Sequence, residues 1–158
     1  SLCAINPDVS VSTVEARLAG EALEAEVRQA DVVLDCSDNF DTRFAVNAAC
    51  VRLGIPLVSG AAVRMEGQLS VFLPGRADSP CYACLYRQGE DEDGTCAENG
   101  VLSPVVGVIG SLQALEGIKV LLSLGDSLCG RLLLFDGLAQ EWRTLNLKRD
   151  PHCPVCGV

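Results

Sequence analysis

The chain has 158 residues, with 12 lysines and arginines against 21 aspartates and glutamates, which gives a formal net charge of −9. This length suffices for one domain with an ordinary hydrophobic core, and the 49% hydrophobic share excludes a disordered acidic tail. The negative charge argues against nucleic-acid binding, which needs a concentrated basic face.

The first part of the chain alternates between strand-like and helix-like segments. In chain order these are a β-rich stretch over residues 9–14, a helix over 20–30, a strand over 31–36, a helix over 42–53 and a strand over 55–58. Strand–helix–strand order with short links is typical of parallel strands, so the pattern predicts an α/β fold.

The second part changes character. The expected segments are a strand over residues 68–73, a polar loop over 80–99, a helix over 103–124 and two closing strands over 132–135 and 142–147. The helix is apolar nearly all round, so we expect it to be largely buried. Gln113, Glu116 and Lys119 interrupt the run, which favours a buried helix over a membrane span.

Nine cysteines, an odd number, indicate reduced thiols in a cytoplasmic setting rather than a disulfide framework. Four of them form two Cys-x-x-Cys motifs, at Cys81 with Cys84 and at Cys153 with Cys156. Four thiolates suit a closed, tetrahedral, structural zinc site that ties the tail to a mid-chain loop. The alternatives are two independent redox pairs or plain buried thiols.

A second group of polar residues follows the strand over residues 31–36. Asp38 lies where a buried strand leads into a helix, and ligands bind at that edge of open α/β sheets. Its carboxylate suits Mg²⁺ beside phosphates, although Asp38 or Asn39 could simply cap the helix. Arg43 and Asn47, four residues apart, either face the same crevice or form a solvated surface.

The remaining cysteines and the single histidine give weaker signals. Cys96 lies in the polar loop beside acidic residues and is either a nucleophile or incidental. Cys36 and Cys50 fall in apolar segments and are expected to be buried packing residues. Cys3 and Cys129 have no informative spacing, and His152 is expected to be a bystander beside Cys153.

Several stretches together are similar to one known family. Residues 31–39 (DVVLDCSDN), 56–68, 81–85, 100–119 and 153–157 (CPVCG) resemble, in order, the ThiF/MoeB/HesA family, bacterial relatives of the ubiquitin-activating enzymes. The resemblance implies a Rossmann-like mixed sheet, parallel strands extended by antiparallel C-terminal strands, with a structural zinc site made of four cysteines. It also implies a homodimer.

The resemblance implies a reaction as well. Family members use ATP and Mg²⁺ to adenylate the C-terminal glycine of a small ubiquitin-like sulfur-carrier protein. Residues 59–68 and 111–114 look closest to the MoeB branch, which serves molybdenum cofactor biosynthesis through the molybdopterin synthase small subunit. The tail is also similar to the ThiF branch, which serves the thiamine sulfur carrier.

The same resemblance assigns site residues. Asp38 matches the nucleotide-site aspartate that is implicated with Mg²⁺ and ATP, which outweighs the capping interpretation. Cys81, Cys84, Cys153 and Cys156 match the zinc ligands. Cys96 matches a loop cysteine that in some members forms a covalent link to the carrier.

The chain also departs from the family pattern. The glycine-rich nucleotide loop is expected before Ser1, so residues 1–158 are expected to be the C-terminal part of the domain and inactive alone. Two alternatives remain open. One is a non-catalytic, zinc-stapled module that binds the carrier, and the other is a dinucleotide-dependent oxidoreductase fragment, which lacks the glycine fingerprint.

Overall fold

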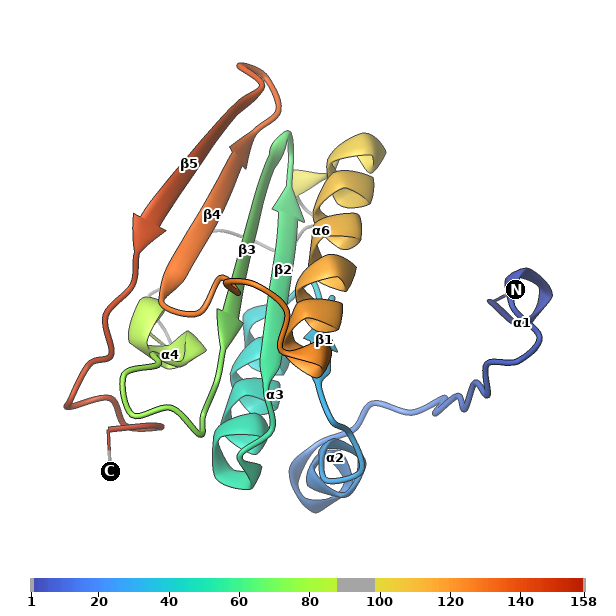
Figure 1. Ribbon diagram of the computed structural model, residues 1–158, viewed down its shortest axis with the longest axis vertical. Coiled ribbons are helices and arrows are strands. Elements are labelled where there is room, and N and C mark those ends of the chain that lie inside the picture. Colours follow the sequence, from blue (N-terminus) through green and yellow to red (C-terminus); the bar gives the residue numbers. More distant parts are fainter. Residues whose placement is uncertain (1, 88–98, 158) are drawn as a thin grey trace.

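The computed structural model describes residues 2–87 and 99–157. Within these residues the strands form one mixed sheet in the order β1-β2-β3-β4-β5, with helices on both faces (Figure 1). The strands are β1 (Val33–Asp35), β2 (Leu57–Val63), β3 (Glu66–Phe72), β4 (Arg131–Asp136) and β5 (Glu141–Asn146). The helices are α1 (Leu2–Ile5), α2 (Gly20–Val27), α3 (Phe40–Leu53), α4 (Tyr82–Leu85) and α6 (Ser103–Leu122).

The strand pairing confirms the predicted α/β class. β1 and β2 run parallel and are joined through α3, whereas β2, β3, β4 and β5 pair antiparallel in sequence order. The sheet is therefore a parallel pair extended by antiparallel strands, as the family resemblance implied. The carboxyl ends of β1 and β2 lie at the same edge of the sheet, because the two strands are parallel.

Helix α3 has clear start and stop signals. The Asn39 side chain accepts a hydrogen bond from the Thr42 backbone N–H at 2.9 Å, which satisfies one of the free N–H groups of the first turn. Gly54 closes the helix in the left-handed conformation at φ 71°. The helix begins at Phe40, two residues before the expected start, because Asn39 is the cap.

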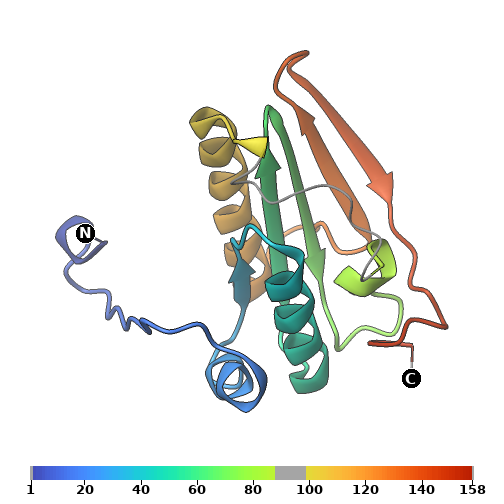
Figure 2. The same ribbon diagram turned by 180° about the vertical axis from the view of Figure 1, so that it is seen from behind.

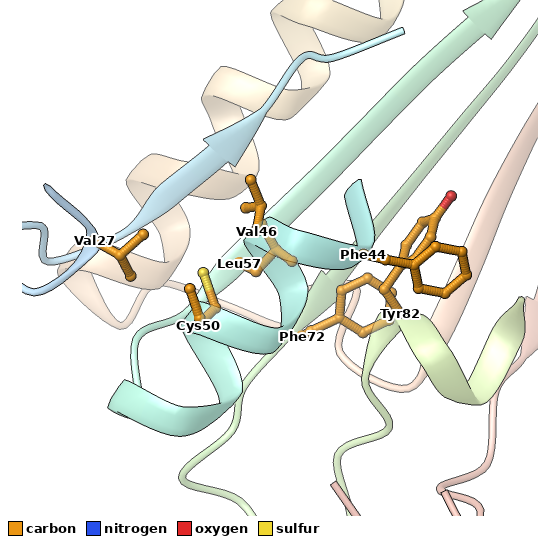
Figure 3. Packing of buried hydrophobic residues seen from close by; sticks show 8 residues of the cluster. Val27, Phe44, Val46, Cys50, Leu57, Phe72 and Tyr82 are labelled. Carbon is orange, nitrogen blue, oxygen red and sulfur yellow. The ribbon is translucent and has the colours of Figure 1, made fainter. Parts of the chain in front are cut away.

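Successive residues of the strands point to opposite faces of the sheet and build two apolar clusters. Leu57 and Phe72 pack with the inner face of α3, and Figure 3 shows them beside Val46, Phe44 and Tyr82. Residues on the alternate positions form the other cluster under α6, with Val58, Leu69 and Val71 fully buried. The view from behind shows α3 and α6 on opposite faces (Figure 2).

Helix α6 packs on the sheet through both apolar and polar side chains, with Val105 and Ile109 buried beside Gln113 and Glu116. The buried Gln113 amide donates to the backbone oxygens of Asp35 at 2.8 Å and Val58 at 3.0 Å. The buried Glu116 carboxylate accepts from the Leu128 N–H at 2.8 Å and pairs with Lys119. The side chains that interrupt the apolar run therefore face inward and join the helix to β1, β2 and the following loop.

The expectation that this helix is largely buried is wrong. In the described part of the chain, it is the one helix long and apolar enough to span a membrane, and 28% of that window is buried. One face of α6 packs on the sheet. Among the described residues, no further element covers its other face. The exposed apolar side chains include Val106, Leu115, Ile118 and Leu122. The contacts of Gln113 and Glu116 with the sheet and the following loop are typical of a helix that packs on a sheet.

Residues 9–14 do not form the expected β-rich element. They run without regular structure between α1 and α2, with Val9, Val11 and Val14 exposed. Figure 1 shows this segment as an arm that leads away from the sheet. β-Propensity alone does not make a strand, because the backbone needs a neighbouring strand as its hydrogen-bonding partner.

Replacing Gln113 by alanine is expected to lower the free energy of unfolding by about 2–4 kcal/mol, since two buried backbone oxygens lose a donor and a cavity remains. Chemical denaturation measures this change. Gln29→Ala, at an exposed position two residues beyond the end of α2, is the matched control and should change stability by less than about 0.5 kcal/mol. Equal stability of the two variants would contradict the proposed role of the amide.

Candidate functional site

Asp38 lies in the turn formed by residues 36–39, between the end of β1 and the start of α3. Its side chain is exposed, and Oδ1 accepts a hydrogen bond from the Asn39 amide at 3.2 Å. Asn39, not Asp38, caps the helix. The Asp38 carboxylate thus stands at the carboxyl edge of the sheet, beside the positive end of a 14-residue helix.

Two buried charged groups hold this turn in place. Asp35, which is 5% exposed, accepts from the Ser37 backbone N–H at 2.9 Å and the Ser37 hydroxyl at 2.7 Å. Arg43 donates to the Ser37 carbonyl from Nε at 3.2 Å and from Nη2 at 2.7 Å. The turn is therefore fixed by a carboxylate on one side and a guanidinium on the other.

The solvated-surface alternative for Arg43 and Asn47 is wrong. Arg43 is 6% exposed and Asn47 is fully buried, and both lie on the inner side of α3. Their spacing of four residues was the available signal, because residues at i and i+4 share one helix face. Residue type alone pointed toward solvent, since arginine and asparagine are mostly exposed.

The turn fits the nucleotide role that the sequence predicts. An exposed carboxylate is a hard oxygen ligand of the kind that Mg²⁺ prefers, and the first N–H groups of α3 favour a nearby anion. The second oxygen of Asp35 is buried with no hydrogen-bond partner among the described residues. The turn therefore combines one available carboxylate with a second, buried one beneath it.

The four cysteines of the two motifs come together as one cluster. Cys81, Cys84, Cys153 and Cys156 place their sulfur atoms within 4.8 Å of one another, and we call this group the four-cysteine cluster. The sulfurs of Cys81 and Cys153 are 3.7 Å apart, and those of Cys84 and Cys156 are 3.4 Å apart. Tetrahedral zinc with bonds of about 2.3 Å needs sulfurs about 3.8 Å apart, so the cluster fits that ion.

The close pairs join one motif to the other, and all eight cysteines of the described residues are free thiols. This arrangement favours a shared metal over two independent redox pairs. Backbone N–H groups of Cys81 and Asp150 point at the Cys84 sulfur, at 3.5 and 3.4 Å. Burial raises the pKa of the Cys81 thiol far above its ordinary value.

The tail is also held by side-chain contacts. Arg149 donates to the backbone oxygens of Ala77, at 2.8 Å, and of Cys156. His152 is exposed, its ring is 3.8 Å from Asp150, and it is not part of the four-cysteine cluster. The bystander interpretation of the histidine therefore agrees with its position.

The other cysteines have mixed outcomes. Cys50 is buried as predicted, and burial raises its pKa to about 12. Cys36 is exposed, so its expected burial is wrong: it follows the last residue of β1, where the turn leaves the sheet. Cys3 is exposed and Cys129 is half-buried. Cys96 lies outside the described residues, and its role as a nucleophile stays a prediction.

The fold and the site together define an α/β domain with an acidic turn at the carboxyl edge of its sheet and a cysteine cluster of metal-binding type. The model of the ThiF family matches residues 1–155. The chain belongs to the ThiF family.

Similar curated proteins agree with this assignment. The chain is 47% identical over 156 residues to the sulfur carrier protein ThiS adenylyltransferase of Escherichia coli, covering 99% of the chain and 61% of that protein. It is 43% identical over 157 residues to the molybdopterin-synthase adenylyltransferase of Salmonella typhimurium, covering 99% of the chain and 63% of that protein. The chain thus spans about three fifths of the length of these relatives.

The fold also matches solved structures. A crystal structure of MccB from E. coli with ATP aligns with a TM-score of 0.80 at 22% identity, covering 99% of this chain and 49% of that chain. At this identity the match concerns the fold alone. It agrees with the mixed sheet that the strand pairing describes.

Proposed function

We propose that this chain belongs to an ATP-dependent adenylyltransferase that activates the C-terminal glycine carboxylate of a small ubiquitin-like sulfur-carrier protein. The observation that carries the proposal is the exposed Asp38 carboxylate, fixed at the carboxyl edge of the sheet by Asp35 and Arg43. The names of the relatives, which are adenylyltransferases, support the same reaction class.

The reaction joins two anions, because a carboxylate must attack the α-phosphate of ATP while pyrophosphate leaves. Bound Mg²⁺ would supply positive charge to the phosphates. In this chain, Asp38 would hold that ion, and the first turn of α3 offers N–H groups to an anion. The Asn39 amide orients the Asp38 carboxylate, and Asp35 holds the neighbouring Ser37.

An apolar groove lies at the same edge of the sheet and is our candidate contact for the carrier. It has a volume of about 440 Å³ and is formed by the β2–β3 turn, the start of α6 and the β4–β5 hairpin. Its lining includes Met65, Val108, Phe135 and Trp142. The groove and the end of β1 lie toward the same edge of the sheet, because β1 and β2 are parallel and the β2–β3 turn follows the carboxyl end of β2.

Replacing Trp142 by alanine is expected to raise the KM for the carrier about tenfold while leaving the KM for ATP unchanged. Trp142 is 45% exposed and its ring lies 4.5 Å from that of Phe135, which makes it a rigid aromatic contact. Initial-rate kinetics on the product of the complete gene, with varied carrier and varied ATP, separate the two constants. Leu124→Ala, an exposed apolar residue beyond the end of α6, is the control. An unchanged KM for the carrier would show that the carrier does not bind in this groove.

We propose the molybdopterin synthase small subunit as the carrier, with the thiamine sulfur carrier as the alternative. Residues 59–68 and 111–114 favour the first, and the 47% identity to the ThiS adenylyltransferase favours the second. Carrier-dependent exchange of radioactive pyrophosphate into ATP, measured on the product of the complete gene with each carrier, decides between them. Exchange with neither carrier would refute the proposal.

A non-catalytic module that binds the carrier is the second candidate, favoured by the metal-type cluster that ties the tail to the sheet. It predicts carrier binding that does not depend on Mg-ATP.

We also propose that the protein is cytoplasmic and forms a homodimer. The exposed apolar face of α6, with Leu115 and Ile118 each 50% exposed, supports the homodimer.

We propose zinc as the metal of the four-cysteine cluster, in a structural role. The four sulfurs use all tetrahedral positions, which leaves none open for substrate. Its contribution to the reaction is therefore to hold the tail and the segment around α4 against the sheet. Cys96, which lies outside the described residues, stays a proposed catalytic cysteine that forms a covalent link to the carrier.

A further inference from the structure

Asn47 contacts the first cysteine motif from inside the protein. It is fully buried on α3, and its Oδ1 accepts a hydrogen bond from the Tyr82 backbone N–H at 2.9 Å. Its Nδ2 donates to the sulfur of Cys81 at 3.7 Å. The orientation of the amide follows from the partners, because the Tyr82 N–H can only donate and so takes the oxygen side.

The same helix holds the Asp38 turn one turn earlier. Arg43 donates two hydrogen bonds to the Ser37 carbonyl, and it shares a face of α3 with Asn47. One helix face therefore contacts both the cysteine motif and the acidic turn.

Aromatic packing also holds α3 and the first cysteine motif together. The rings of Phe44 and Tyr82 meet edge to face with centroids 5.4 Å apart, and Tyr82 meets Phe72 in the same way at 6.3 Å. Figure 3 shows the three rings gathered between α3 and the start of α4. A shift of the cysteine motif therefore moves α3 as well, since close-packed side chains transmit displacement.

We propose that Asn47 is a positioning residue that couples the metal at the four-cysteine cluster to the turn that carries Asp38. The inference rests on the zinc part of the proposed function. The amide N–H stabilises the Cys81 thiolate, as contacts to metal ligands do in other sites. The amide oxygen holds the start of α4 against α3 by accepting from the Tyr82 N–H. Arg43, on the same helix, donates to the Ser37 carbonyl and so holds the turn that carries Asp38.

The test uses Asn47→Asp, which keeps the shape and the acceptor for Tyr82 but sets an oxygen against the sulfur. Zinc affinity, measured by competition with a chromogenic chelator, is expected to fall about 10- to 100-fold. The sulfur-to-cobalt charge-transfer band of the Co²⁺-loaded protein is expected to shift. Asn146→Asp, an exposed position on β5 with the same charge change, should alter neither.

Amide hydrogen exchange measures the coupling between the four-cysteine cluster and the Asp38 turn. In the unmodified protein, zinc is expected to slow exchange in the peptide that covers residues 36–47, and Asn47→Asp is expected to lose this slowing even when saturated with zinc. Unchanged affinity together with the same slowing would overturn the inference. Should Asn47→Asp not fold, Asn47→Ala gives the comparison, with a smaller loss of affinity expected. An unmodified protein that binds no zinc would refute the metal assignment and the inference together.

Discussion

Replacing Cys153 by serine is expected to abolish stoichiometric zinc binding and to release the C-terminal tail from the sheet. Cys153 is 2% exposed, and its sulfur lies 3.7 Å from that of Cys81, so its loss opens the tetrahedron on the buried side. Structural zinc sites contribute about 10 kcal/mol or more in small zinc-binding peptides. We expect a loss of more than about 5 kcal/mol here, larger than that of a typical core substitution.

Metal analysis of the purified variant and chemical denaturation measure these two effects. Cys3→Ser is the matched control, because Cys3 is an exposed free thiol outside the four-cysteine cluster. It should keep one zinc per chain and the original stability. A Cys153→Ser protein with full zinc content would show that the four thiols do not share one ion.

Replacing Asp38 by asparagine in the product of the complete gene is expected to lower the rate of carrier-dependent pyrophosphate exchange about 10²- to 10³-fold without loss of stability. The substitution keeps the shape of the side chain at an exposed position and removes the charge that would hold Mg²⁺. Because the cap of α3 is Asn39, the helix itself should be unaffected.

Asp41→Asn is the control for this change. Asp41 is an exposed carboxylate in the first turn of the same helix, so its replacement removes the same charge from the same helix end. Exchange in that variant should stay within about twofold of the original rate, given the small effect of exposed charges. Equal losses in the two variants would indicate a general effect of charge and would contradict a specific role for Asp38.

The elements that the sequence predicted well are those with local signals. Gly54 ends α3 where expected, and the strands β1 to β5 overlap the segments predicted as strands. Such features depend on a few adjacent residues, whose conformational preferences are strong. The convergence of the motifs was predictable because four soft ligands in two pairs suit one ion.

Features that depend on tertiary contacts were harder to predict. The apolar character of α6 indicated burial, but its inward stripe is formed partly by Gln113 and Glu116, whose partners lie far away in the sequence. For the same reason, the sequence left open whether Arg43 and Asn47 face the interior or solvent, and both are buried. A buried polar side chain is stabilised by partners that no local pattern reveals.

We propose that the product of the complete gene places AMP on the C-terminal carboxylate of a small carrier protein. Intact-mass analysis of the carrier, after incubation with Mg-ATP and the product of the complete gene, tests it most directly. We predict a carrier species heavier by one adenylyl group, absent without Mg-ATP and strongly reduced with the Asp38→Asn variant. A carrier that binds tightly but keeps its original mass under all these conditions would contradict the claim.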